Sequence, residues 1–240
     1  KEPVTVFFRG APKPGIYGVH AGGTIRVLGA LPFTVPYPFR LTHEVKNVTV
    51  TPAVPPDLPN PPRDLVDQGN VVTYDLVKTI SPTLQVTDSY RYNRTEFTLT
   101  KRVTKTGNST TTFTPSPAIV LESMTSGDRD AWSSAGADRE SNIAMVVQGT
   151  IEKREFVDLC GQNYDAWKVN SNEQVVNLDT GEQSGTDPQQ PNVYRFANHL
   201  GGLVISEEGH FTTVIEVAGQ LVPVEFDYVS TFDSVEPRPR

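Results

Sequence analysis

Cysteine and histidine are scarce in this chain of 240 residues, which has one cysteine, Cys160, and four histidines. A single thiol excludes an internal disulfide, and therefore the small folds that disulfides hold together. A zinc site needs three or four converging ligands, but no CxxC, HExxH or HxH pattern is present, and His20, His43, His199 and His210 lie apart. We therefore predict no metal site and no cofactor.

Other function classes also lack their sequence signals. The patterns GxxxxGK[ST], GxGxxG and GxSxG are absent, which argues against a phosphate loop, a dinucleotide site and the nucleophile elbow of an α/β-hydrolase. No apolar run reaches the roughly 18 residues of a membrane-spanning helix, and no dense Lys/Arg cluster of the kind that binds nucleic acid is present. We predict no enzyme, no catalytic residue, no nucleic-acid partner and no transmembrane segment. A hydrolase that uses Cys160 or a pair of carboxylates is a less favoured alternative.

Charge is divided unevenly along the chain, whose net charge is -7. Residues 1–120 contain 13 Lys/Arg and 8 Asp/Glu, a net charge of +5, whereas residues 121–240 contain 8 and 20, a net charge of -12. Such asymmetry suits a polarised surface for a protein partner or docking between two halves, and a solvated surface is the simpler interpretation.

Proline and glycine are abundant, with 20 and 18 residues, which favours many turns and short strands. Alternation of apolar and polar residues is strongest in 84–92, 95–103 and 221–229. Weaker alternation covers 4–8, 16–20, 24–28, 41–50, 71–79, 143–159, 164–169, 173–178, 193–197, 202–206 and 211–217. Helical periodicity is limited to a possible short helix in 61–68, and 128–142 is too rich in Gly, Ser and Asp for a long helix. The predicted fold class is all-β and mostly antiparallel, with few short helices, as a large curved sheet or half-barrel or as two packed sheets.

The three strongest segments also predict which side chains face inward. In 84–92 the apolar face consists of Leu84, Val86, Tyr90 and Tyr92. In 95–103 it consists of Phe97, Leu99 and Val103, with Arg102 on the polar face. In 221–229 it consists of Val222, Val224, Phe226 and Tyr228.

A proline-rich stretch marks the best candidate for a domain boundary. The segment 51–64 contains six prolines, and each proline fixes φ and removes a hydrogen-bond donor. We predict an N-terminal β segment in 1–50, a linker in 51–64 and a main antiparallel β domain in 65–235, with a single domain that includes 1–50 as the alternative.

The stretch around the cysteine, REFVDLCGQNYDAWKV (154–169), is interpreted as a strand, a bend and a strand. Gly161 and Asn163 supply the permissive backbone of the bend. Cys160 falls on the same face as Phe156 and is expected to be a small buried hydrophobic residue. Trp167 is expected to point into the core or into a cavity.

Aromatic residues are the candidate ligand-binding residues. Those expected on inward faces, either filling the core or lining a hydrophobic cavity, are Trp132, Trp167, Tyr90, Tyr92, Phe97, Phe226 and Tyr228. A curved antiparallel sheet closes around a ligand where its inner side chains do not fill the space.

Three segments carry a resemblance to known proteins. FTPSPAIVLESMTSGDRDAW (113–132) followed by VQGTIEKREFVDLCGQNYDAWKV (147–169) resembles a Gly-Trp and Gly-turn strand layout of secreted bacterial β-proteins, and PKPGIYGVHAGGTIRVLG (12–29) resembles the start of uncharacterised exported actinobacterial proteins. The layout is similar to that of lipoprotein-carrier-like half-barrel proteins, some of which bind lipids on a concave face.

The resemblance implies an exported or cell-surface β protein, extracellular or in the cell envelope, with no signal segment in the sequence at hand. We expect it to bind a lipid or another hydrophobic small molecule in the concavity of the sheet. A structural or protein-interaction domain without a small ligand, which uses the acidic half or exposed sheet edges, is the alternative.

Overall fold

The computed structural model describes residues 10–29, 31–52, 69–123, 131–186, 189–197, 203–217 and 220–238. Within these ranges, no helix has the length and apolar character to cross a membrane. The described strands are β1 (Gly15–Val27), β2 (Phe33–Pro36), β3 (Arg40–Thr51), β4 (Val71–Ser81), β5 (Leu84–Tyr92), β6 (Glu96–Thr106), β7 (Ser109–Phe113), β8 (Ile119–Ser123), β9 (Ala131–Asp138), β10 (Ile143–Leu159), β11 (Gln162–Asn177), β12 (Gln183–Thr186), β13 (Asn192–Ala197), β14 (Val204–Val217) and β15 (Gln220–Phe232).

These strands form one antiparallel sheet, which confirms the predicted all-β class. Its order is β7-β6-β5-β4-β3-β1-β15-β14-β12-β11-β10-β9; β13 pairs with β11 and β14, β2 with β1, and β8 with β6. Most neighbours in the sheet are also consecutive in the sequence. The exceptions are the pairings of β1 with β3 and β15, of β6 with β8, of β11 with β13 and of β12 with β14.

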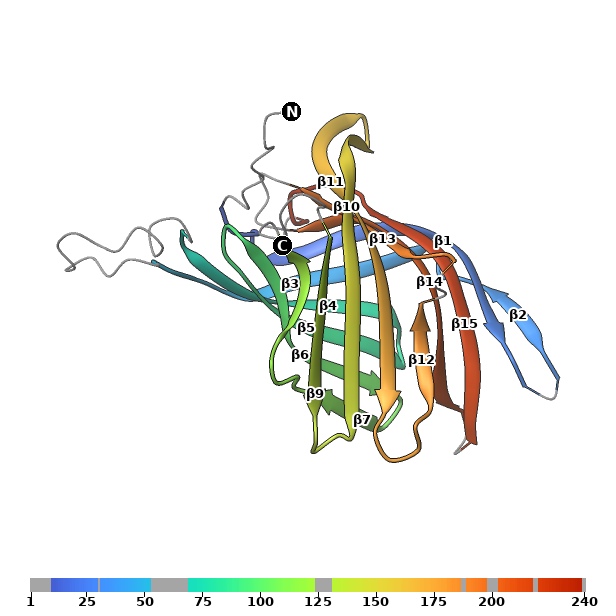
Figure 1. Cartoon of the computed structure of the whole chain (residues 1–240). Helices are drawn as coiled ribbons and strands as arrows, with labels where there is room; N and C mark the ends of the chain where they lie inside the picture. The colour runs from blue at the N-terminus through green and yellow to red at the C-terminus, as the bar shows by residue number, and fades with distance from the viewer. Residues whose placement is uncertain are drawn as a thin grey trace.

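The sheet curves so that its two halves face each other (Figure 1). Strands β3 to β7 form one wall and strands β9 to β15 form the other, with β1 between them. The rings of Phe97 on β6 and Phe196 on β13 meet across the interior, with 5.3 Å between their centroids. The ends of the sheet also approach each other, because β8 pairs with β6 while Ser116 forms a bridge to Ala137 of β9.

The alternation predicted for 221–229 is present in β15. Val224, Phe226 and Tyr228 are buried, whereas the side chains of Glu225 and Asp227 are 45% and 61% exposed. In β5, Tyr90 and Tyr92 are likewise buried. The period-two pattern therefore locates the inward face of both strands correctly.

The predicted face of Arg102 is wrong. A register shift places Tyr90 opposite Leu99 but Ser89 opposite Lys101, and Asp88 is therefore opposite Arg102. This β-bulge leaves one extra residue on β6 and reverses the alternation beyond it. Arg102 consequently shares the inward face with Leu99.

One end of the interior is filled by aromatic rings. Tyr74, Tyr90, Tyr92, Phe97 and Phe196 are each at most 6% exposed. The rings of Tyr90 and Phe97 lie 4.8 Å apart, and those of Tyr74 and Tyr90 lie 5.4 Å apart. Tilted and edge-on contacts of this kind add to the free energy that the burial of apolar surface provides.

The bend predicted within 154–169 is a two-residue hairpin turn, but the predicted burial of Cys160 is wrong. Leu159 pairs with Gln162, and the two central residues, Cys160 and Gly161, have φ values of 53° and 89°. Positive φ at both positions defines a type I′ turn, which matches the twist of a hairpin. Cys160 is exposed at the tip, and Phe156 on the adjoining strand is 74% exposed. The two residues do share a face, as predicted, but that face is exposed, and the buried side chain next to the turn is Leu159.

Strands from both sides of the proposed boundary belong to the same sheet. β1 pairs with β15, and β3 pairs with β4. Most of the predicted linker 51–64, the helix considered for 61–68 and the strand predicted for 4–8 lie outside the described residues. The division at 51–64 remains a prediction.

Candidate functional site

Five charged side chains on inward faces of the sheet form the candidate site, which we call the interior charged layer. They are Lys78 on β4, Asp88 on β5, Arg102 on β6, Glu173 on β11 and Glu207 on β14. Lys78 Nζ lies 3.0 Å from Glu207 Oε2, although β4 and β14 are not neighbours in the sheet. This contact crosses the interior and joins the two walls.

Asp88 and Arg102 form a two-pronged ion pair on adjacent strands. Arg102 Nε donates to Asp88 Oδ1 at 2.6 Å, and Nη2 donates to Oδ2 at 3.0 Å. The hydroxyl of Tyr90 donates to Asp88 Oδ2 at 3.0 Å. Burial alone would raise the pKa of Asp88, but the guanidinium of Arg102 and these hydrogen bonds hold it below its usual range. Asp88 is therefore a carboxylate at neutral pH.

Lys78 and Glu207 form the second ion pair. Burial would lower the pKa of Lys78, but Glu207 raises it; burial would raise the pKa of Glu207, but Lys78 lowers it. The hydroxyl of Tyr228 also donates to Glu207 Oε1. Both groups are therefore charged at neutral pH.

Glu173 is the fifth charged group. Its Oε1 accepts a hydrogen bond from the hydroxyl of Tyr194 at 2.6 Å and lies 3.4 Å from Ser171 Oγ. Burial alone would lower the pKa of Arg102, but Asp88, with a smaller contribution from Glu173 on the facing wall, holds it well above its ordinary value. Burial, followed by Glu173, raises the pKa of Tyr194 well above its ordinary value.

His43 lies beside this layer and carries no charge at neutral pH. Burial, reinforced by the positive charge of Lys78, lowers its pKa to about 3. Its ring meets that of Phe232 edge-on at 5.4 Å. The neutral imidazole belongs to the packed side of the interior and adds no cation to the layer.

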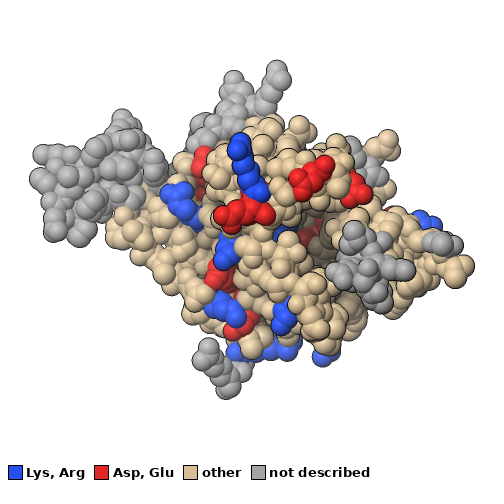
Figure 2. All heavy atoms as spheres, turned by 90° about the horizontal axis from the view of Figure 1, so that it is seen from below, with Lys and Arg blue, Asp and Glu red and all other residues tan. Residues whose placement is uncertain are grey.

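The interior is hollow on one side of the charged layer. The side chains of Arg102, Lys78 and Glu207 keep 32%, 20% and 11% of their surface exposed, although they point between the walls, whereas Asp88 is fully buried. Figure 2, which views the molecule from below, shows a hollow in this end with acidic side-chain atoms inside it. Water therefore reaches the layer from the end opposite the aromatic core.

Apolar side chains lie between the charged layer and the open end. Val86 lies two residues before Asp88, and Val175 lies two residues after Glu173, on the same faces of their strands. Ile80 is the extra residue at a β-bulge of β4 and packs against the core. All three are only partly buried. On β14, Phe211 is stacked on Phe226 with 4.9 Å between the rings. The hollow thus combines an apolar entrance with a charged floor.

The predicted ligand-binding aromatics divide between packed core and hollow. Tyr90, Tyr92 and Phe97 lie in the aromatic cluster that fills the closed end. Phe226 and Tyr228 lie on the wall near the hollow. The ring of Tyr228 stacks on that of Tyr37, with 4.5 Å between their centroids. The hydroxyl of Tyr228 donates a hydrogen bond to Glu207 of the charged layer.

The two tryptophans lie outside the hollow's charged floor. Trp132 on β9 donates its Nε1 proton to the carbonyl oxygen of Val120 at 3.2 Å, and its ring covers Gly149, where a Cβ would be 2.0 Å from the ring. It therefore closes the seam between β8 and β9. Trp167 is 7% exposed and is covered by the guanidinium of Arg154, 5.7 Å from the ring centroid.

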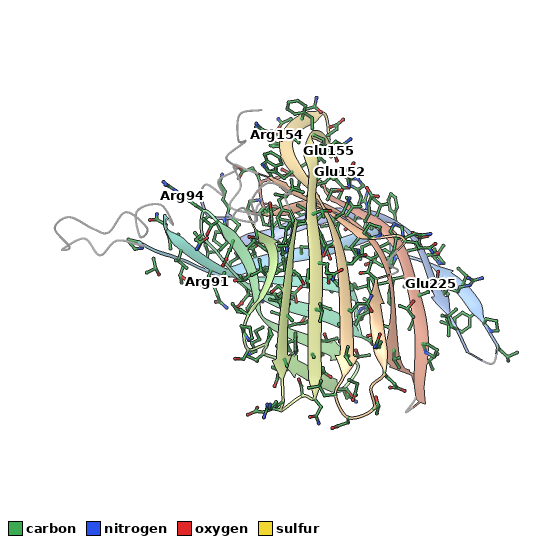
Figure 3. The ribbon with its side chains drawn as sticks, in the orientation of Figure 1. Arg91, Arg94, Glu152, Arg154, Glu155 and Glu225 are labelled. Carbon is green, nitrogen blue, oxygen red and sulfur yellow. The ribbon has the colours of Figure 1, made fainter. Side chains whose placement is uncertain are left out.

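An ion-pair ladder runs along the outer face of the second wall. Lys168 contacts Glu152 at 2.6 Å, and Arg195 joins Glu155 to Glu208, the latter at 2.6 Å. Figure 3 shows Glu152 and Glu155 on the upper part of β10, away from the hollow. Two of these pairs connect neighbouring strands, and the pair of Arg195 with Glu155 spans β11, which lies between β13 and β10. All three contribute to the sheet, not to the candidate site.

The described residues contain no group of three or more His, Cys, Asp or Glu side chains that could hold a metal ion. Glu122 on β8 is buried, and neither carboxyl oxygen has a hydrogen-bond partner among the described residues. Burial raises its pKa to about 8. Glu122 is therefore mostly protonated at neutral pH and does not add a negative charge to the interior.

Sequence reasoning missed the charged layer, although the sequence contains a signal for part of it. Asp88 falls in phase with Leu84, Val86, Tyr90 and Tyr92, on the face predicted to be buried. A charged residue at a buried position of an alternating strand needs a partner. Lys78 is in phase with Leu76 in the same way, but the pairing across the interior is visible only in the structure.

Comparisons with known proteins add little to this description. No protein-family model matches the chain, and no curated protein sequence matches it significantly. A solved structure from Parabacteroides distasonis ATCC 8503, described as a "putative lipoprotein", is similar over 95% of this chain and 97% of its own, with 11% sequence identity and a TM-score of 0.45. At this level the similarity assigns neither a family nor a function, and the proposals below depend on the residues of this chain.

Proposed function

We propose that this protein binds a hydrophobic or amphipathic small molecule, such as a lipid, in the hollow between the two walls of its sheet. The observation that carries the proposal is the partial exposure of Lys78, Arg102 and Glu207 on inward faces, below an entrance of partly buried apolar side chains. A ligand there buries apolar surface against the entrance, with a gain of about 25 cal/mol per Å².

The proposed location is outside the cell or in the cell envelope. The resemblance of residues 12–29, 113–132 and 147–169 to exported bacterial β-proteins supports this location.

Native mass spectrometry of freshly purified protein tests whether a hydrophobic molecule is bound. A variant whose hollow is blocked by a large side chain tests whether the hollow is the binding site. Val175→Trp places a large ring on the inner face of β11, whereas Val229→Trp places the same ring on the outer face of β15, where the native side chain is 47% exposed. We expect the first variant to bind the neutral apolar dye N-phenyl-1-naphthylamine at least about tenfold more weakly than the second. Equal binding by both variants would show that the hollow is not the site.

A protein-interaction function is the second candidate, and an exposed apolar hairpin favours it. Leu31, Phe33 and Val35 are 86%, 56% and 38% exposed on and before β2, whose pairing among the described strands is with β1 alone. Exposed apolar strand edges are common sites of association. Sedimentation analysis of wild type and Phe33→Ser separates the two candidates. If the protein interacts through β2, the wild type should self-associate or bind a partner and the variant should not. Binding of the dye should be the same in both proteins.

A further inference from the structure

We infer that the ligand of the hollow carries a positively charged amino or quaternary ammonium group, held at the charged layer, together with an apolar tail. This inference depends on the proposed function, which it makes more specific. It follows from the charges of the layer and from the way in which its two cations are already paired.

The interior charged layer has one carboxylate more than it has cations. Lys78 and Arg102 supply two positive charges, whereas Asp88, Glu173 and Glu207 supply three negative charges. His43, which lies beside the layer, is neutral, as described above. The floor of the hollow therefore has a net charge of -1, in a partly buried site where electrostatic interactions are stronger than in water.

Both cations are already paired within the protein. Arg102 makes two hydrogen bonds to Asp88, and Lys78 bonds to Glu207. An anionic ligand could use only the remaining N–H donors of these cations, and the carboxylates already bound to them would repel it. A cationic ligand meets no such repulsion, because the layer has one carboxylate more than it has cations.

Glu173 is the carboxylate available to such a ligand. The side-chain hydrogen bonds described for it come from the neutral hydroxyl groups of Tyr194 and Ser171. The rings of Tyr228 and Tyr37 form a stack nearby, and Tyr228 interacts electrostatically with Tyr194. A carboxylate attracts an ammonium group through charge, and an aromatic ring adds a cation–π contact where the cation reaches its open face.

Isothermal titration of the whole chain with probes of matched tail length tests the inference. The probes are decyltrimethylammonium, decanoate and decan-1-ol, each below its micelle or solubility limit, and choline without a tail. We expect decyltrimethylammonium to bind at least about tenfold more tightly than decanoate, with decanol between them. Glu173→Gln, which keeps an acceptor for the Tyr194 hydroxyl, should remove most of this difference.

Glu225→Gln is the matched control, since it removes the same charge from the outer face of β15, where Figure 3 labels the residue. If it reduces the preference as much as Glu173→Gln does, the effect is a long-range field and the inference is wrong. Decanoate binding as tightly as decyltrimethylammonium, while decanol binds, also overturns the inference but leaves the proposed function intact. If no tailed probe binds, the proposed function fails. Choline binding as tightly as the tailed cation supports the preference for positive charge. It also overturns the apolar tail, because the ligand would then be a small ammonium compound without one.

Discussion

Asp88→Asn removes a fully buried charge while it preserves the size of the side chain and an acceptor for the Tyr90 hydroxyl. The guanidinium of Arg102 then loses its ionic partner. Breaking a buried ion pair from one side costs roughly 3–5 kcal/mol. Because Arg102 keeps 32% of its side-chain surface in contact with water, we expect the lower end of this range, about 3 kcal/mol, which corresponds to a decrease in Tm of roughly 6–12 °C for a chain of this size.

Urea unfolding followed by circular dichroism measures this difference. Glu225→Gln is the control, because its 3.7 Å contact with Arg26 is between side chains that are 60% and 45% exposed, and such a pair is worth at most about 1 kcal/mol. The low pKa of Asp88 in the folded state means that its contribution is present above the unfolded-state pKa of about 3.9 and is lost as the pH falls through the folded-state value. The variant should therefore approach wild-type stability in acid. A loss below about 1 kcal/mol at pH 7, or a difference that is the same at pH 7 and in acid, would refute the reasoning.

Three further predictions concern positions outside the charged layer. Burial raises the pKa of Glu122 to about 8, so the wild type should lose stability as the pH rises from about 4.5 to 8. The free energy of unfolding of Glu122→Gln should increase relative to that of the wild type by on the order of a few kcal/mol across this range. Urea titrations at pH 5 and pH 8 measure this difference, and parallel pH profiles would contradict it. Gly149→Ala places a Cβ 2.0 Å from the Trp132 ring and should cost about 1–3 kcal/mol with a changed near-ultraviolet circular dichroism spectrum; an unchanged spectrum would show that the ring does not cover this position. Exposed Cys160 should react completely with a thiol reagent in the native state, and a thiol that reacts only after unfolding would contradict its place at the hairpin tip. Cys160→Asn suits the left-handed turn and should leave the stability unchanged or raise it by up to about 0.5 kcal/mol.

The fold was largely predictable because alternation is a local property of the chain. The segments 84–92 and 221–229 alternate over most of their length, and the structure has strands with the expected buried faces there. Alternation failed at Arg102 because a β-bulge adds a residue, and no local pattern in 95–103 marks that position. It failed at Cys160 because the face that carries the apolar Phe156 is the exposed face of this hairpin, and Leu159 is buried instead.

The candidate site was less predictable because it depends on contacts between distant segments. Lys78 and Glu207 are separated by 129 residues and by several strands of the sheet. Each is an ordinary charged residue in its own sequence context. Aromatic residues gave a better signal for the packed core than for the hollow, since Tyr90, Tyr92 and Phe97 all lie at the closed end.

The pairing of β1 with β15 has a consequence for how the protein is made. Val19 lies opposite Phe232, 213 residues later in the sequence. Strands β1 to β7 can pair with one another while the chain leaves the ribosome, but the pairing of β1 with β15 must wait until β15 has been synthesised. The two walls therefore close around the hollow only after translation of nearly all the described chain, and a ligand enters the hollow after synthesis rather than during it.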